Sequence, residues 1–226
     1  MLLLPLLLVA VPASAGERSF MVGNFERIRV DGPFEVRVTS GGSPRASASG
    51  DPRALDQLDV HVDGTTLVVG TGVRQLQRDA PALPVVVISV PQLRAALVNG
   101  GGHVQVAGMR GQRVDLGVNG AGRLEVSAVE ADQLVLTLTG TGAATLAGRA
   151  AKARFNSNGA GTIEASGLAA GDLVVYASTA GSTRATALHT AEVTAMGVGE
   201  VVVEGAAACT AHGPGPVRCA GGTASN

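Results

Sequence analysis

Short alternations of apolar and polar residues, separated by glycine turns, recur along the chain from residue 97 to residue 205. Between one glycine turn and the next lie two such alternations, for example Val104 and Val106, followed by Val114 and Leu116. A period of two residues predicts strands that bury one face. No segment within a repeat has the length and the 3.6-residue period of an amphipathic helix. Each repeat is therefore predicted to hold two short strands and two tight turns.

The glycine turns return at a nearly constant spacing. A polar or small residue followed by Gly-x-Gly occurs at 99–102, 119–122, 139–142 and 158–161, and in weaker form at 178–181 and 196–199. The last glycines of successive turns are 20, 20, 19, 20 and 18 residues apart. Such a period is typical of a solenoid, in which each repeat buries its apolar side chains against its neighbours. We predict an all-β solenoid of roughly five or six rungs, most simply a right-handed parallel β-helix.

The first residues predict an export signal at 1–15. An apolar run from Leu2 to Val11 precedes the small-residue cleavage site Ala13-Ser14-Ala15. The run is too short to span a bilayer. No Lys or Arg precedes Arg18, which a true start further upstream would explain. The mature chain is expected to begin near Gly16, in the periplasm or at the cell surface, with residues 16–24 as an N-terminal linker.

One solenoid domain is expected over residues 25–219, and its first part, 25–96, alternates without the Gly-x-Gly period. We expect irregular first rungs and an N-terminal cap there, because the open end of a solenoid leaves strand edges unpaired. Within it, Asp63-Gly64 predicts a hairpin turn. Residues 54–58 favour one helical turn, and 71–83 a surface loop.

The regular repeats are expected at 97–205, followed by a C-terminal cap at 206–219 and a disordered tail at 220–226. Cys209 and Cys219 are the two cysteines of the chain. In an exported protein, two cysteines at this spacing most simply form a disulfide. A redox-active pair is less favoured, because the Cys-x-x-Cys spacing is absent. The predicted role of the bond is to hold the C-terminal cap together.

Three segments together suggest a family. The alternating stretch from Phe25 to Val38, the apolar strand Val85 to Val90 before Pro91, and the Gly-x-Gly repeats that follow resemble the auto-transporter adhesin head domains of the GIN type. The resemblance covers residues from about 25 to about 213. It implies an exported bacterial protein with an adhesin-like role and a molecular function that is not established. It implies no catalytic residue in this sequence.

A line of amides precedes the glycine turns. Asn99, Asn119 and Asn158 share this position, with Thr139 and Ser178 in the same column. One interpretation is a polar line that binds a ligand. The other, which we favour, is a structural ladder in which stacked amides hydrogen-bond from rung to rung and stabilise the turns.

Charge and composition narrow the choice of partner. The formal net charge of −1 gives no electrostatic basis for binding nucleic acid or an anionic membrane. Aromatic residues make up 2% of the chain, without tryptophan, which argues against stacking platforms for sugars or bases. The four histidines, at positions 61, 103, 189 and 212, show no metal-ligand spacing. We predict no metal site and no cofactor.

Enzymatic activity would require clustered carboxylates. Glu125 and Glu164 occupy the same outward column two rungs apart, which predicts a separation of roughly 10 Å in a regular stack, near that of an inverting carboxylate pair. Thr145 lies between them and no other residue supports a catalytic pair, so we favour a solvated strand face. We therefore predict an exported, non-enzymatic solenoid of the cell envelope, adhesin-like, that contacts an envelope protein or polysaccharide. The alternative is a carbohydrate-active enzyme of the β-helix type, a polysaccharide lyase or hydrolase.

Overall fold

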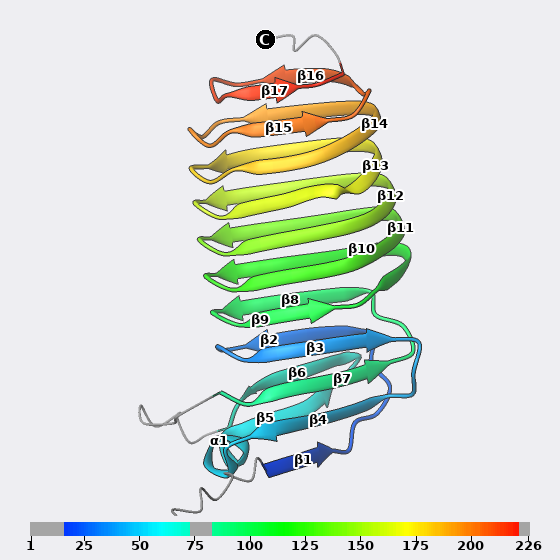
Figure 1. Ribbon diagram of the computed structural model, residues 1–226, viewed down its shortest axis with the longest axis vertical. Coiled ribbons are helices and arrows are strands. Elements are labelled where there is room, and N and C mark those ends of the chain that lie inside the picture. The colour runs from blue at the N-terminus through cyan, green and yellow to red at the C-terminus, as the bar shows by residue number, and fades with distance from the viewer. Residues whose placement is uncertain (1–15, 73–82, 222–226) are drawn as a thin grey trace, which may run out of the picture.

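The computed structural model describes residues 16–72 and 83–221, which form a tall stack of flattened rungs (Figure 1). The predicted export signal at 1–15, most of the predicted loop at 71–83 and the end of the predicted tail lie outside the described residues. In each regular rung a front strand runs to the right, bends back and returns behind while the chain climbs (Figure 1). This course is right-handed. The predicted fold class is confirmed.

The regular rungs are built from long strands that pair in parallel with the strand above and below. Each long strand covers the rear layer of the stack, and most of them begin in the front layer (Figure 1). The Gly-x-Gly turns form one edge, the turn edge, and the bends form the other, the bend edge. The strands of this part are β8 (Ala95–Gly100), β9 (His103–Val106), β10 (Met109–Gly120), β11 (Arg123–Gly140), β12 (Ala143–Gly159), β13 (Thr162–Thr179) and β14 (Thr183–Ala195).

The core lies between the two layers and follows the predicted alternation. The position two residues after each second glycine is buried in every rung, as expected, at Val104, Leu124, Ala144, Ile163, Thr183 and Val201. Burial of these columns supplies the hydrophobic driving force that one rung alone lacks. Toward the C-terminal end the core side chains become smaller, as Ala165, Ala177, Ala185 and Ala195 illustrate.

The rung next to the regular stack comes from an unexpected place in the sequence. It consists of β2 (Arg27–Asp31) and β3 (Glu35–Ser40). β2 pairs in parallel with β8 on one side and with β6 (Thr66–Thr71) on the other. β3 likewise lies between β9 and β7 (Val85–Val90). The rung β2–β3 is therefore inserted between two rungs that follow it in the chain.

The N-terminal end is closed by antiparallel strands and a short helix (Figure 1). β5 (Leu58–Asp63) pairs with β6 through a hairpin at Gly64, where φ is +60°. The expected helical turn is α1 (Pro52–Gln57), and the side chain of Asp51 accepts a hydrogen bond of 2.8 Å from the backbone N–H of Arg53. Such an N-cap satisfies one of the free donors of the first turn.

Residues 16–24 are not merely a linker, which corrects the sequence-based expectation. Their first part is β1 (Gly16–Phe20), which pairs antiparallel with β4 (Arg45–Gly50), and β4 pairs with β7. The partner strand β4 lies in a segment of small and polar residues that resembles a loop in the sequence. Because β1 depends on β4 for its backbone hydrogen bonds, its strand character has no strong local signal.

The C-terminal rung is held together by a covalent bond. β15 (Val201–Glu204) pairs with β14, and the last strands, β16 (Ala208–His212) and β17 (Val217–Cys219), pair with β14 and β15. Cys209 of β16 and Cys219 of β17 form the predicted disulfide. The bond therefore joins the rear layer to the front layer at the end of the stack.

Candidate functional site

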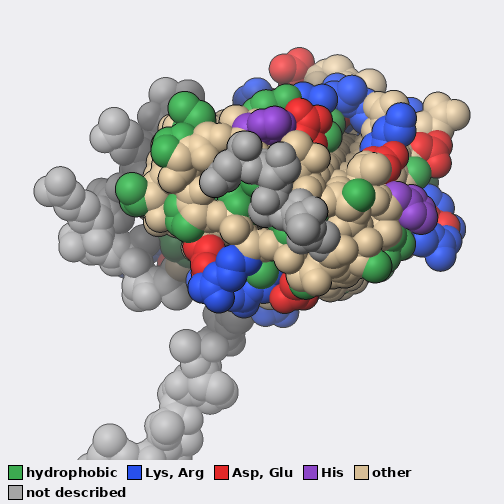
Figure 2. All heavy atoms as spheres, turned by 90° about the horizontal axis from the view of Figure 1, so that it is seen from above, with side chains coloured by type: hydrophobic (Ala, Val, Ile, Leu, Met, Phe, Trp, Pro, Cys, Tyr) green, Lys and Arg blue, Asp and Glu red, His purple; other side chains and the backbone are tan. Residues whose placement is uncertain are grey.

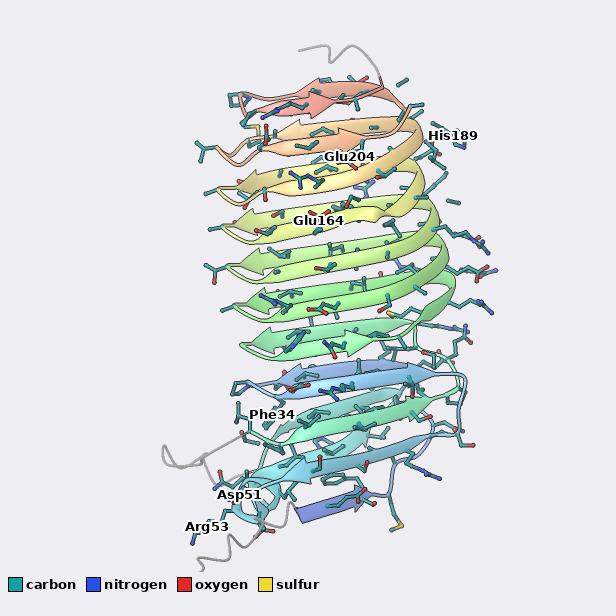
Figure 3. All side chains as sticks on the ribbon, viewed as in Figure 1. Phe34, Asp51, Arg53, Glu164, His189 and Glu204 are labelled. Carbon is teal, nitrogen blue, oxygen red and sulfur yellow. A yellow bond between two sulfur atoms is a disulfide. The ribbon has the colours of Figure 1, made fainter. Side chains whose placement is uncertain are left out.

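The two carboxylates proposed for catalysis lie on the front layer, where Glu164 is labelled in Figure 3. Strand register places Glu125 opposite Thr145, and Thr145 opposite Glu164, as the repeat predicts. Oε1 of Glu125 lies 3.0 Å from Nε2 of His103. Oε2 of Glu164 lies 3.7 Å from Nη1 of Arg184. Each carboxylate has its own partner, so the two do not form the facing pair that glycoside hydrolysis uses.

Charged side chains also gather at the bend edge, where His189 is labelled in Figure 3. There the carboxylate of Glu130 is bound by the guanidinium groups of Arg149 and Arg110, the latter at 2.7 Å. The hydrogen bond from Arg149, with the charge of Arg110, holds the pKa of Glu130 below its ordinary value of 4.5. A hollow of about 500 Å³ adjoins these charges and reaches Met109. The triplet of two arginines and one glutamate keeps a net charge of +1, and both guanidinium groups are already paired with the Glu130 carboxylate.

The amide line lies along the turn edge. The Nδ2 group of Asn119 donates a hydrogen bond of 3.0 Å to Oδ1 of Asn99, and Nδ2 of Asn99 donates one of 2.7 Å to Oδ1 of Asp31. Strand register then places Thr139 between Asn119 and Asn158. The rung-to-rung bonds therefore join the inserted rung β2–β3 to β8 and β10, and a threonine separates the third asparagine from them.

From the end of β10 to the turn after β14, the surface at the turn edge carries no charged side chain. We define the turn-edge band as the outward residues of the last part of β10 to β14 and the tips of the turns that follow. None of its residues is ionisable at neutral pH, and most are exposed. The band consists of Gly117, Asn119, Ala121, Thr137, Thr139, Thr141, Asn156, Asn158, Ala160, Tyr176, Ser178, Ala180, Thr194, Met196 and Val198.

The contrast between the two edges is visible end-on. Hydrophobic side chains lie at the turn edge, on the left of Figure 2, and basic and acidic side chains lie at the bend edge on the right and also along the lower side of the view. Met196 and Val198 contribute to the apolar side, with exposures of 60% and 83%. The two edges therefore offer different chemistry to a partner.

Tyr176, the one tyrosine of the chain, lies within the turn-edge band on the rear layer. Its side chain is 41% exposed, and the guanidinium carbon of Arg154 lies 5.6 Å from the centre of its ring. Such a cation–π contact favours this orientation of the ring. Beside the ring is a shallow groove of about 430 Å³, lined by Thr137, Thr139, Asn156, Asn158, Ser178, Thr194 and Met196 among others. We call this feature the Tyr176 groove.

Residues 24–207 match the family model described as "Putative auto-transporter adhesin, head GIN domain". The chain belongs to this family. The match spans the solenoid from just before β2 to the residues that follow β15 and Gly205, so it includes the inserted rung and all regular rungs. The resemblance drawn from the strand and turn pattern is thereby confirmed. None of the curated proteins matches the chain.

Several solved structures share the fold of this chain. The chain is similar to a "putative adhesin" from Bacteroides fragilis, with a TM-score of 0.82 and 20% identity over 91% of this chain and 97% of that one. A "putative adhesin" from Parabacteroides merdae has a TM-score of 0.68 and 17% identity over 92% and 97%. A "Putative lipid binding protein" from Parabacteroides distasonis has a TM-score of 0.66 and 15% identity over 92% and 97%. At these identities the likeness concerns the fold.

Two further observations describe this GIN domain. Within residues 16–72 and 83–221, no helix is long and apolar enough to cross a bilayer. In the same part of the chain, no group of three or more His, Cys, Asp and Glu side chains is placed to hold a metal ion.

Tyr176 is not apparent as a binding residue from the sequence. An aromatic content of 2% argues against an extended stacking surface. It does not show that one of the few aromatic rings, that of Tyr176, is exposed. The signal that could have found it is positional. Tyr176 lies two residues before the small residue Ser178 of its turn, in the outward column that Thr137 and Asn156 also occupy.

Proposed function

We propose that this GIN domain is an exported, non-enzymatic, adhesin-like module of the cell envelope, and that the turn-edge band contacts a protein or polysaccharide there. One observation carries the proposal. The band is free of charge on successive rungs of the rear layer, while the front layer and the bend edge bear ion pairs such as Glu164–Arg184 and Glu130–Arg149. A surface without charged side chains loses less hydration free energy than a charged one when a partner covers it.

The proposal that the domain is non-enzymatic is supported by the separate partners of Glu125 and Glu164. A glycosidase needs one carboxyl group held protonated near a second one that remains ionised. Glu125 contacts His103 and Glu164 contacts Arg184, so the two carboxylates are not arranged as such a pair.

Binding to envelope fragments tests the function. The mature chain and two variants, Ser178→Arg in the band and Thr145→Arg on the front layer, would be sedimented with bacterial envelope fragments. Both substituted side chains are exposed, so both variants should fold. We expect the Ser178→Arg variant to bind roughly tenfold more weakly or worse, about 1.4 kcal/mol, and the Thr145→Arg variant to bind like the wild type. Equal binding by both variants, or release of cleaved polysaccharide, would contradict the proposal.

Export is tested separately through the N-terminus. When the whole chain is produced in a bacterium with an outer membrane, we expect it outside the cytoplasm with Gly16 as its first residue, as intact-mass measurement would show. Gly16 is also the first residue of β1, so cleavage there would leave the N-terminal cap complete. Recovery of the chain in the cytoplasm with residues 1–15 still attached would refute export.

A further inference from the structure

We infer that the Tyr176 groove is a binding site for a neutral polysaccharide, with one segment of the glycan chain seated against the ring of Tyr176. This inference rests on the proposed function, because it names the ligand class of the same surface. Three features of the groove support it: its hydrogen-bonding groups, its aromatic ring and the distribution of charge around it.

The hydrogen-bonding groups of the groove suit a sugar. Its polar side chains are hydroxyls and primary amides, provided by residues such as Thr139, Asn158 and Ser178. Each of these groups can both donate and accept a hydrogen bond. A sugar hydroxyl also donates and accepts, so it can hydrogen-bond to these groups in either role. Because the strands are about 4.8 Å apart, these groups form parallel rows that an extended chain can contact at several points.

The ring of Tyr176 supplies the apolar contact. A pyranose presents C–H groups on its faces, and an aromatic ring with a polar tip covers such a face while its hydroxyl stays hydrated. The contact with Arg154 holds the ring without a partner molecule, so little side-chain entropy is lost on binding. Met196, which follows the neighbouring strand β14 and also lines the groove, is exposed and adds apolar surface.

The charges around the groove favour a ligand without net charge. On the bend-edge side, register places Val174 between Arg154 and Glu192, so the rim carries one positive and one negative group. The groove itself is lined by neutral residues. A nucleic acid, an acidic glycan or an anionic lipid headgroup would need several Lys or Arg side chains to pair with its charges. A neutral polysaccharide has no such requirement.

A protein partner is the main rival, and the composition of the groove disfavours it. Protein interfaces gain most of their affinity from well-packed apolar and aromatic anchors at their centre. Around Tyr176 the neighbours are small and polar, such as Asn156 and Thr194, which pair with it in register. They provide many hydrogen-bonding groups and little apolar area.

A glycan array, followed by affinity electrophoresis with neutral dextran, mannan and arabinoxylan and with acidic polygalacturonate, tests the site. We expect the mature chain to bind at least one neutral glycan. The variant Tyr176→Ala should lose roughly tenfold or more in affinity, and Tyr176→Phe, which keeps the ring, should stay within about threefold. The front-layer variant Thr145→Arg serves as the control. A screen without neutral-glycan binding, a preference for acidic glycans, or a Tyr176→Ala variant that binds normally would overturn the inference.

Treatment of the envelope fragments separates this inference from the proposed function. Periodate cleaves the vicinal diols of sugars, and a protease removes envelope proteins. If periodate abolishes binding and protease does not, the glycan assignment is supported. If protease abolishes binding that depends on Ser178 and periodate does not, the adhesin-like function stands and the glycan assignment fails. If the untreated fragments bind neither the wild-type protein nor its variants, the proposed function itself fails.

Discussion

Some residues of the solenoid core are polar, although the fold offers them no partner. The hydroxyl groups of Ser157 and Thr183 are buried and make no hydrogen bond within the described part of the chain. Thr183 lies in an inward column between Ile163 and Val201. A buried hydroxyl without a partner loses its hydration and gains nothing in return.

Replacing Thr183 by valine should therefore stabilise the protein. Valine has nearly the same shape and fits the aliphatic column, so we expect Thr183→Val to raise the free energy of unfolding by about 1–3 kcal/mol. Thr162→Val is the control, because Thr162 points outward from a neighbouring rung and should change stability by less than about 0.5 kcal/mol. Chemical denaturation measures both. Destabilisation by Thr183→Val would mean that a buried water serves the hydroxyl.

The glycines of the turns differ in how much space they have. A Cβ atom on Gly142 would lie 2.4 Å from the carbonyl oxygen of Gly122, whereas one on Gly101 would meet nothing within 4 Å. Gly142→Ala should therefore push adjacent rungs apart and lower stability by about 1–3 kcal/mol. Gly101→Ala should be neutral or slightly stabilising, by about 0.4–1 kcal/mol. The turn tips Ala121 and Ala160 already carry such a methyl group. Equal melting temperatures for the two variants would contradict this steric explanation.

Glu130 gives stability a dependence on pH. Its pKa is lowered in the folded state, so its contribution is complete above the ordinary value of 4.5 and is lost as the pH falls through the folded value. We expect Glu130→Gln to melt at a lower temperature than the wild type at pH 7, and the two to converge well below pH 4.5. Because Glu130 is partly exposed, added salt should shrink the difference. A difference that is the same at every pH would contradict the ion-triplet explanation.

At the scale of elements, the disulfide acts on one rung. Cys209 and Cys219 are separated by 10 residues and link β16 to β17. Opening a loop of this size should reduce stability by about 2–3 kcal/mol. In a solenoid each rung contacts only its neighbours, so the loss should be local. We expect the variant with both cysteines changed to serine to exchange amide hydrogens faster in β16 and β17, with β11 and β12 unaffected. Uniformly faster exchange along the stack would argue against a local role.

Elements with a local signal were predictable, and those that depend on distant partners were not. The regular rungs, the hairpin at Gly64 and the disulfide follow from periodicity, turn residues and cysteine spacing. β1 and β4 have no such signal, since each is a strand only through the other and through β7. The order in which β2 and β3 enter the stack has no local signal either. It is fixed by pairing with strands some 40 to 70 residues away.

At the scale of the whole molecule, the repeat in the sequence predicts which side chains share a surface. The contacts between these side chains become known only from the structure. The sequence places Glu125 and Glu164 in one column, and the structure agrees. It cannot show that the side chains of His103 and Arg184 contact them. The turn-edge band arises because the outward residues of successive rungs are all uncharged. This becomes apparent only when the rungs are stacked in the structure.

The insertion of β2–β3 between later strands has a consequence for how the stack is assembled. A chain is synthesised from its N-terminus, yet the strands β2 and β3 have no parallel neighbours until β6, β7, β8 and β9 have followed. The strands β2, β3, β6, β7, β8 and β9 must therefore come together as one unit with many non-local pairings, which are slow to form. From β10 onward each new rung needs only the edge of the rung before it. We therefore expect the N-terminal block to act as a template, with growth of the solenoid in one direction, from the closed end toward the disulfide.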